Sequence, residues 1–143
     1  MIEIRRSALV NYSPAQMFGL VNDVEAYPKR FPWCVGAEIL EHGDDVLVAR
    51  LDLKFAGFRQ SFTTRNTTHP PARLHMSLVD GPFRTLEGVW EFIALGEDGC
   101  KISFALDFEY AGRLGGGMIK LGFQGLANRM VDDFCHEAAR VYG

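Results

Sequence analysis

Several classes of protein are excluded by what this sequence lacks. Its three cysteines, Cys34, Cys100 and Cys135, lie far apart and form no C-x-x-C pair, so neither a disulfide framework nor a zinc site is indicated. It has no run of eighteen apolar residues and no charged-then-apolar leader at Met1–Val10, so we expect a soluble, cytoplasmic protein. A net charge of −3 provides no general attraction to polyphosphate, which disfavours DNA as a partner.

Apolar residues, in contrast, are abundant. They make up 48% of the 143 residues and include 11 phenylalanines, enough to bury a substantial core. The sequence shows no internal repeat, linker or low-complexity segment. We therefore expect a single domain over residues 1–143.

The last thirty residues, from Gly115 to Tyr142, are predicted to form one long amphipathic helix. Glycines 122 and 125 fall inside it, and each costs about 1 kcal/mol relative to alanine. We interpret them as permitting close approach of another surface or leaving room for a ligand. The helix prediction rests on apolar residues at steps of three or four, namely Ile119, Phe123, Leu126, Met130, Phe134, Ala138 and Val141.

The segment before this helix is predicted to be mostly β-strand. Alternation over Ile2–Val10 indicates a half-buried strand, and Ser13-Pro14 is typical of a helix start. The proline-rich, aromatic segment Asp23–Cys34 predicts a short helical turn and a kinked entry to the sheet. Turn signals, including Ala56-Gly57, then separate six strands at Val35–Glu41, Val46–Phe55, Phe58–Asn66, Arg73–Val79, Thr85–Ala94 and Lys101–Tyr110.

This order predicts an α+β fold in which one helix packs on an antiparallel sheet. Seven strands spaced about 4.8 Å apart would span roughly 34 Å, whereas a helix is about 10–12 Å wide. The sheet must therefore curl around the helix and leave a concave apolar volume, the default binding-site hypothesis. Its expected lining is Leu51, Phe55, Phe62, Met76, Leu86, Trp90, Phe104 and Phe108 from the sheet, and Ile119, Phe123 and Met130 from the helix.

Polar residues on the apolar faces are candidates for binding a ligand head group. By strand alternation these are Gln60, Thr64 and Tyr110, and each needs a hydrogen-bonding partner when buried. A buried water or a one-residue error in register is the alternative explanation. Ala37, Ala49 and Gly88 on inner faces favour unfilled space, although large side chains filling the interior remain the alternative. Trp33 and Phe83 are the candidates for the cavity mouth.

No catalytic constellation and no metal ligand set is indicated. The four histidines, His42, His69, His75 and His136, fall in turns or on polar faces, with no carboxylate or nucleophile beside them in sequence. Six basic residues would face RNA or anionic lipid if they converged in space, and would otherwise be dispersed on the surface. They are Arg5, Arg6, Lys29, Arg30, Arg59 and Arg65.

Four stretches of the sequence resemble the coenzyme Q-binding protein family. They are Tyr27-Pro28 to Phe31-Pro32-Trp33-Cys34, Ser61 to Asn66, Leu78 to Arg84 with Leu86, Gly88 and Trp90, and Ala127 to Asp132 with Phe134-Cys135 and Val141 to Gly143. That family also contains the bacterial ribosome-association toxin and belongs to the START-like, polyketide cyclase/dehydrase superfamily. The resemblance implies a helix-grip fold, in which a curved seven-stranded antiparallel sheet wraps around the C-terminal helix and leaves an apolar tunnel.

The resemblance also implies a function. The ligand would be ubiquinone or another polyisoprenoid quinone, and the protein a binder that supports respiratory electron transfer, with no required cofactor and no enzymatic activity. One alternative is a protein that binds a ribosomal subunit, the large one included, and blocks subunit joining; another is an enzyme acting on a ring in the cavity. Lys29-Arg30-Phe31 departs from the family's acidic-Phe-Leu pattern, and this more basic loop suits peripheral contact with an anionic membrane or a ribosome.

Overall fold

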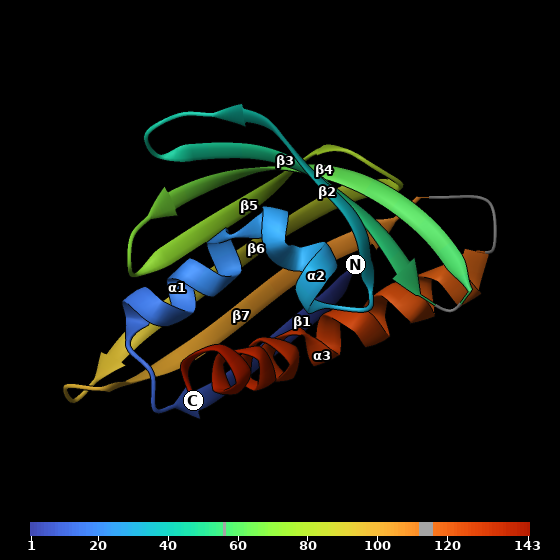
Figure 1. The fold of residues 1–143 in the computed structure, drawn as a ribbon. Coiled ribbons are helices and arrows are strands. Elements are labelled where there is room, and N and C mark those ends of the chain that lie inside the picture. Colours follow the sequence, from blue (N-terminus) through green and yellow to red (C-terminus); the bar gives the residue numbers. More distant parts are fainter. Residues whose placement is uncertain (56, 112–115) are drawn as a thin grey trace.

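A curved antiparallel sheet holds one long helix in its concave face (Figure 1). The computed structural model describes residues 1–55, 57–111 and 116–143; Ala56 and Gly115, which the sequence predictions include, lie outside the described residues. The elements are β1 (Ile2–Val10), α1 (Pro14–Asn22), η1 (Val24–Ala26), α2 (Tyr27–Arg30), β2 (Cys34–His42), β3 (Val46–Phe55), β4 (Phe58–His69), β5 (Arg73–Asp80), β6 (Phe83–Leu95), β7 (Gly99–Tyr110) and α3 (Gly116–Tyr142).

The seven strands form one sheet in the order β1-β7-β6-β5-β4-β3-β2, and all neighbours are antiparallel. The predicted fold class is confirmed. Several strands are longer than the sequence predicted: β4 continues past Asn66 to His69, and β6 begins at Phe83 instead of Thr85. The β-branched Thr67 and Thr68 pair with β5, so this hairpin continues further than its turn residues suggested.

Helix α1 begins as the sequence predicts. Ser13 accepts a hydrogen bond from the Gln16 backbone N–H, and the Gln16 side chain accepts one from the Ser13 backbone N–H, which together make a capping box. Pro14 occupies the first turn. The helix buries Met17, Phe18, Leu20 and Val21. It thereby closes one end of the concave face of the sheet (Figure 1).

Helix α3 packs against β1, β3, β7 and α1 along most of its length. Its predicted apolar face is buried from Ile119 to Ala138 except for the half-buried Met130, and Ala127 and Val131 are buried as well. Val141 is 40% exposed, contrary to its predicted place on the packed face. The last turn contacts the start of α1 through Tyr142 instead, whose hydroxyl donates to the Gln16 carbonyl at 3.2 Å.

Two expectations about glycines are wrong. A Cβ at Gly125 would meet only Arg129 Nη1, at 3.8 Å, so this residue neither permits a close approach nor leaves room in the core. Gly88 does face inward, but its space is already filled: a Cβ there would lie 2.6 Å from Met76 Cε and 3.2 Å from Leu106 Cδ1. The flexible Met76 side chain therefore occupies the volume that Gly88 leaves.

We expect Ser13→Ala to lower the free energy of unfolding by about 1 kcal/mol, because it removes the acceptor that caps α1. Ser7→Ala, on the exposed part of β1, is the matched control and should stay within about 0.5 kcal/mol of the parent. Urea denaturation measures both variants. Equal stability of the two would contradict a stabilising cap.

Candidate functional site

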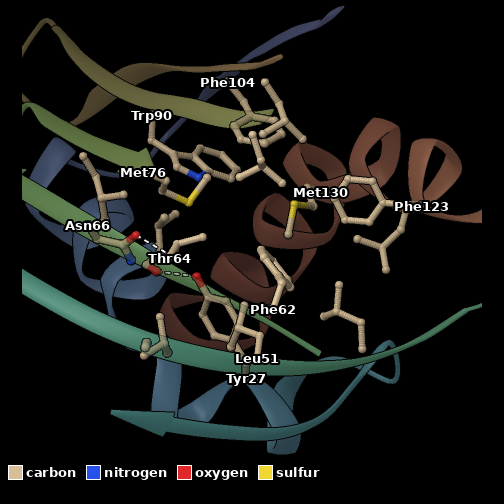
Figure 2. A pocket seen from close by; sticks show the side chains of 18 residues that line it. Tyr27, Leu51, Phe62, Thr64, Asn66, Met76, Trp90, Phe104, Phe123 and Met130 are labelled. Carbon is tan, nitrogen blue, oxygen red and sulfur yellow. Dashed lines mark hydrogen bonds between the residues drawn. The ribbon is translucent and has the colours of Figure 1, made fainter. Parts of the chain in front are cut away.

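An apolar cavity of about 50 Å³ lies between the inner face of the sheet and α3 (Figure 2). It is lined by Leu51, Phe62, Thr64, Met76, Leu86, Trp90, Phe104, Phe123 and Met130, all of which sequence analysis placed there, together with Val21, Val24, Tyr27, Ala49, Leu53, Asn66, Leu74, Leu106 and Leu126. The strands contribute alternate residues, so the lining follows from the two-residue period of the sheet.

A second compartment of about 10 Å³ lies near the start of α3. Five further candidates line it, namely Phe55, Gln60, Phe83, Tyr110 and Ile119. Phe62 and Phe123 line both compartments, and their rings meet edge to face with centroids 6.3 Å apart. This ring pair therefore separates the two spaces.

Phe108 lines neither compartment. It is fully buried behind the second compartment, where its ring packs edge to face against Phe83 and Phe123 at centroid distances of 6.0 and 4.9 Å. Phe108 therefore supports the wall without forming its surface.

The two residues predicted for the cavity mouth lie in different places. Phe83 is 9% exposed and packs against Phe123 at 4.9 Å, so it belongs to the lining of the second compartment. Trp33 lines neither compartment. Its indole N–H donates to Asp133 Oδ2 at 2.9 Å and its ring stacks on Phe31 at 4.8 Å, which fixes the loop after α2 against α3.

Thr64 and Asn66 form the polar corner of the larger cavity. The Thr64 hydroxyl donates to Asn66 Oδ1 at 2.9 Å, and the Asn66 side chain is only 4% exposed (Figure 2). None of the hydrogen bonds between described residues uses the Asn66 Nδ2 donors, which leaves them available to a guest. Sequence analysis missed Asn66, although it has the same phase on its strand as Phe62 and Thr64.

None of the described residues that line the cavity offers a group for acid–base work near neutral pH. Tyr27 is the titratable residue among its lining, and burial raises the pKa of its hydroxyl, which donates to the Val21 carbonyl. His75 lies 3.7 Å from Glu87, but both side chains are on the exposed face of the sheet. Within the described residues, no three His, Cys, Asp or Glu side chains are grouped as metal ligands.

The volume of the cavity is smaller than that of the tunnel expected from the sequence. A volume of about 50 Å³ accommodates a few waters, whereas pockets for drug-sized ligands are about 300–1,000 Å³. Aromatic rings fill much of the interior: Trp90 stacks on Phe104 at 4.3 Å and meets the Phe134 edge at 5.3 Å. Larger guests require side chains to move, and Met76 and Met130 are the most adaptable of those that project inward.

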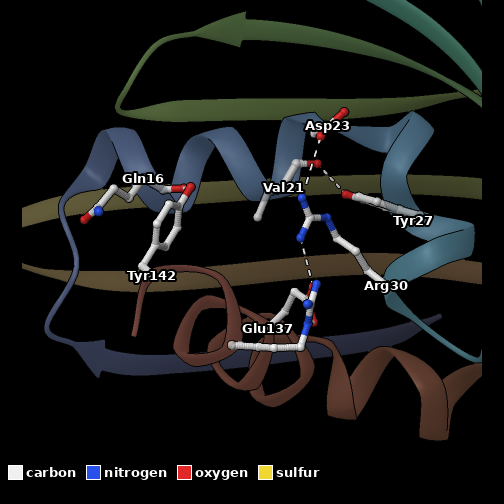
Figure 3. Close-up of polar contacts among 8 residues, drawn as sticks. Gln16, Val21, Asp23, Tyr27, Arg30, Glu137 and Tyr142 are labelled. Carbon is white, nitrogen blue, oxygen red and sulfur yellow. Dashed lines mark hydrogen bonds and ion pairs between the residues drawn. The ribbon is translucent and has the colours of Figure 1, made fainter.

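An ion-pair cluster joins α2 to the last turns of α3 (Figure 3). Arg30 Nη1 donates to Glu137 Oε1 at 2.8 Å, and Arg140 donates to the same carboxylate. Hydrogen bonds from Arg140 and then Arg30 lower the pKa of Glu137 from its ordinary value of 4.5, against the opposing effect of its burial. Sequence analysis did not identify Glu137, which is 7% exposed, because its partner Arg30 lies on a distant segment.

Comparison with known proteins defines the class. The model of the family described as polyketide cyclase/dehydrase and lipid transport matches residues 10–135, and the chain belongs to this family. Zhui aromatase/cyclase from Streptomyces has the same fold, with a TM-score of 0.87 and 20% identity over 99% of this chain and 96% of that one. No helix among the described residues is long and apolar enough to cross a bilayer.

Two relatives carry more particular names. Ribosome association toxin RatA of Pseudomonas aeruginosa is 45% identical over 140 residues, which cover 98% of this chain and 97% of that protein. Coenzyme Q-binding protein COQ10 homolog B, mitochondrial, of Xenopus laevis is 28% identical over 99% of this chain and 60% of its own length. The family resemblance inferred from the sequence is therefore confirmed.

We expect Glu137→Gln to reduce the free energy of unfolding at pH 7 by about 1.5–3 kcal/mol, because both arginines lose a charged acceptor. The pKa of Glu137 is lower in the folded state, so its stabilising effect is present above its ordinary pKa and is lost as the pH falls through the folded value. The difference in the free energy of unfolding between the wild type and Glu137→Gln should therefore be smaller at pH 3 than at pH 7. Urea denaturation at both pH values tests this, with the exposed Asp132→Asn on the same helix as the control. A loss of stability in Glu137→Gln that is the same at both pH values would contradict a stabilising role for the ionised Glu137 carboxylate.

Proposed function

We propose that this protein binds a polyisoprenoid quinone such as ubiquinone and shields or delivers it in support of respiratory electron transport. The observation that carries the proposal is an enclosed apolar cavity whose polar corner presents an unused amide donor, Asn66 Nδ2. A quinone carbonyl is an acceptor for such a donor, and an isoprenoid tail matches the apolar walls. The lipid-transport description of the family and the name of the Xenopus relative support this choice.

The energetics favour binding over free solution for such a lipid. Each buried CH₂ contributes about 0.8 kcal/mol, so a few isoprene units outweigh the cost of moving side chains. The ring would occupy the larger cavity beside Asn66, and the tail would extend past Phe62 and Phe123 into the second compartment. Accommodating this guest would require the ring pair and the two methionines to move aside.

Binding is preferred over catalysis in this proposal. Some proteins with this fold are aromatase/cyclases, as the Zhui structure is, and such chemistry needs an acid or base near the ring. Here the cavity presents Thr64, Asn66 and a neutral Tyr27. The hydroxyl and amide groups of these residues can donate a hydrogen bond that orients a carbonyl, without transferring a proton at neutral pH.

We expect Asn66→Leu to weaken ubiquinone binding about fivefold to tenfold, the value of one hydrogen bond to a neutral acceptor. Binding of a polyprenol of matched length, which has no ring carbonyl, should change little. Thr68→Val is the control, because Thr68 is a buried hydroxyl that does not line the cavity. Native mass spectrometry and tryptophan fluorescence titration measure both ligands.

Two results would overturn the quinone proposal. One is wild-type protein that is recovered without lipid and takes up no ubiquinone from detergent or vesicles. The other is equal loss of quinone and polyprenol binding in Asn66→Leu, which would mean that Asn66 supports the fold instead of the ring.

A second candidate function is association with a ribosomal subunit in the cytoplasm, so that subunit joining is hindered. The observation that favours it is the name of relatives at 43–45% identity over nearly their whole length. Around the loop after α2, a surface groove of about 350 Å³ is bordered by Arg129, by Asp133 and by the ion-paired Glu137 and Arg140, and Lys29 is exposed nearby. The cationic side chains of Lys29 and Arg129 suit contact with ribosomal RNA.

We expect the wild-type protein to cosediment with ribosomal subunits in sucrose gradients and to lose this binding as salt rises. The double variant Lys29→Gln/Arg129→Gln should bind several-fold more weakly. Arg73→Gln, an exposed arginine on β5, is the control. No cosedimentation, together with an unchanged proportion of joined ribosomes on overexpression, would exclude this function and leave the quinone proposal unaffected.

A further inference from the structure

The first half of α3 exposes apolar side chains on its outer face. Met118 is 64% exposed and Leu121 is 67% exposed, and their spacing of three residues places them side by side on the helix. A Cβ at Gly117 would meet nothing within 4 Å, and at Gly125 only Arg129. Of the side chains near these two glycines, Arg129 alone comes within 4 Å, and we call the surface around Met118 and Leu121 the outer α3 face.

Charge is unevenly distributed along the same helix. Residues 117–129 contain Lys120 and Arg129 and no acidic residue, whereas the three acidic residues of α3 all lie in its second half. The adjoining ends of β3 and β4 lie beside the start of α3 (Figure 1), and Lys54 pairs with Arg59 there. Lys54 and Arg129 border the same surface groove. Glu109 lies near Lys120, so positive charge is concentrated on the flank towards the adjoining ends of β3 and β4.

The outer α3 face also lies at one end of the apolar interior. Ile119, next to Met118 in the sequence, points inward and lines the second compartment together with Phe83 and Tyr110. Consecutive residues of one helical turn thus contact the interior on one side and solvent on the other. A surface that binds this face would lie within one helix diameter of the interior.

We propose that the outer α3 face docks on an anionic lipid membrane. Met118 and Leu121 would enter the boundary between head groups and acyl chains, while Lys54, Arg59 and Arg129 contact lipid phosphates. The apolar side chains of Met118 and Leu121 match the acyl chains in polarity, and the basic residues beside them match the negative charge of the head groups. The proposal does not rest on the quinone proposal, because docking needs no ligand in the cavity.

The test is cosedimentation of the full chain with vesicles that contain phosphatidylcholine alone or phosphatidylcholine with 30% phosphatidylglycerol, without quinone. We expect binding to the anionic vesicles, weakened at least tenfold by Met118→Ser/Leu121→Ser. Each of Lys54→Gln and Arg59→Gln should weaken it about fivefold, and 0.5 M salt should weaken it further.

The matched control is Leu9→Ser/Ile93→Ser. These two residues are also exposed and apolar, at 73% and 49%, and both pair with Lys101 on the far part of the sheet. The control should bind vesicles as the parent does, and the urea midpoints of all variants should be similar. Quinone uptake from detergent micelles should be unchanged in Met118→Ser/Leu121→Ser, which separates this proposal from the cavity.

Three results would overturn the membrane proposal. The first is wild-type protein that binds neither vesicle, and the second is equal loss of binding in both double variants. The third is a concentration-dependent dimer, or cosedimentation with ribosomes, that Met118→Ser/Leu121→Ser abolishes while vesicle binding is absent. That result would assign the outer α3 face to a second copy of the chain or to a ribosomal partner.

Discussion

The mismatch in width between one helix and a seven-stranded sheet determines most of this structure. A helix can cover only about a third of a flat sheet of this size, so the sheet curves around α3, and α1 closes one end. The apolar surface that remains must be filled by long side chains or by a guest. In this protein aromatic rings and two methionines fill most of it, and the residual cavity is small.

The composition of that filling determines how the interior can respond to a ligand. Rings such as Trp90 and Phe104 stack and are held on several sides, so they resist displacement. Met76 is different, because its methyl group sits in the space left by Gly88 and the thioether chain has several accessible rotamers. The interior thus combines rigid aromatic rings with an adaptable methionine beside them (Figure 2), an arrangement suited to a flexible lipid tail.

Local patterns predicted the elements well and the site only in part. The period of two over β1 and β7, the Ser13-Pro14 start of α1 and the helical spacing of α3 each depend on neighbouring residues, so the sequence alone was sufficient. Strand alternation also selected the cavity side of β4, although Asn66 was overlooked. Trp33, Phe83, Gly88 and Glu137 were misjudged or missed because their environments depend on partners far away in the chain. How much volume remains after packing is likewise a property of the whole fold.

The contacts that hold the two ends of α3 differ, and this difference bears on which end of a bound lipid would enter first. Near its C-terminus the helix is fastened to α2 by Arg30 with Glu137 and to the loop after α2 by Trp33 with Asp133. At the other end Phe123 of the helix packs against Phe83, and the hydrogen bonds between described residues include no such side-chain pair there. The polar corner at Asn66 lies towards the fastened end, beside Val21 and Tyr27. For the proposed quinone, entry from the end near Phe83 would carry the ring foremost towards Asn66 with the chain trailing, and departure would reverse that order.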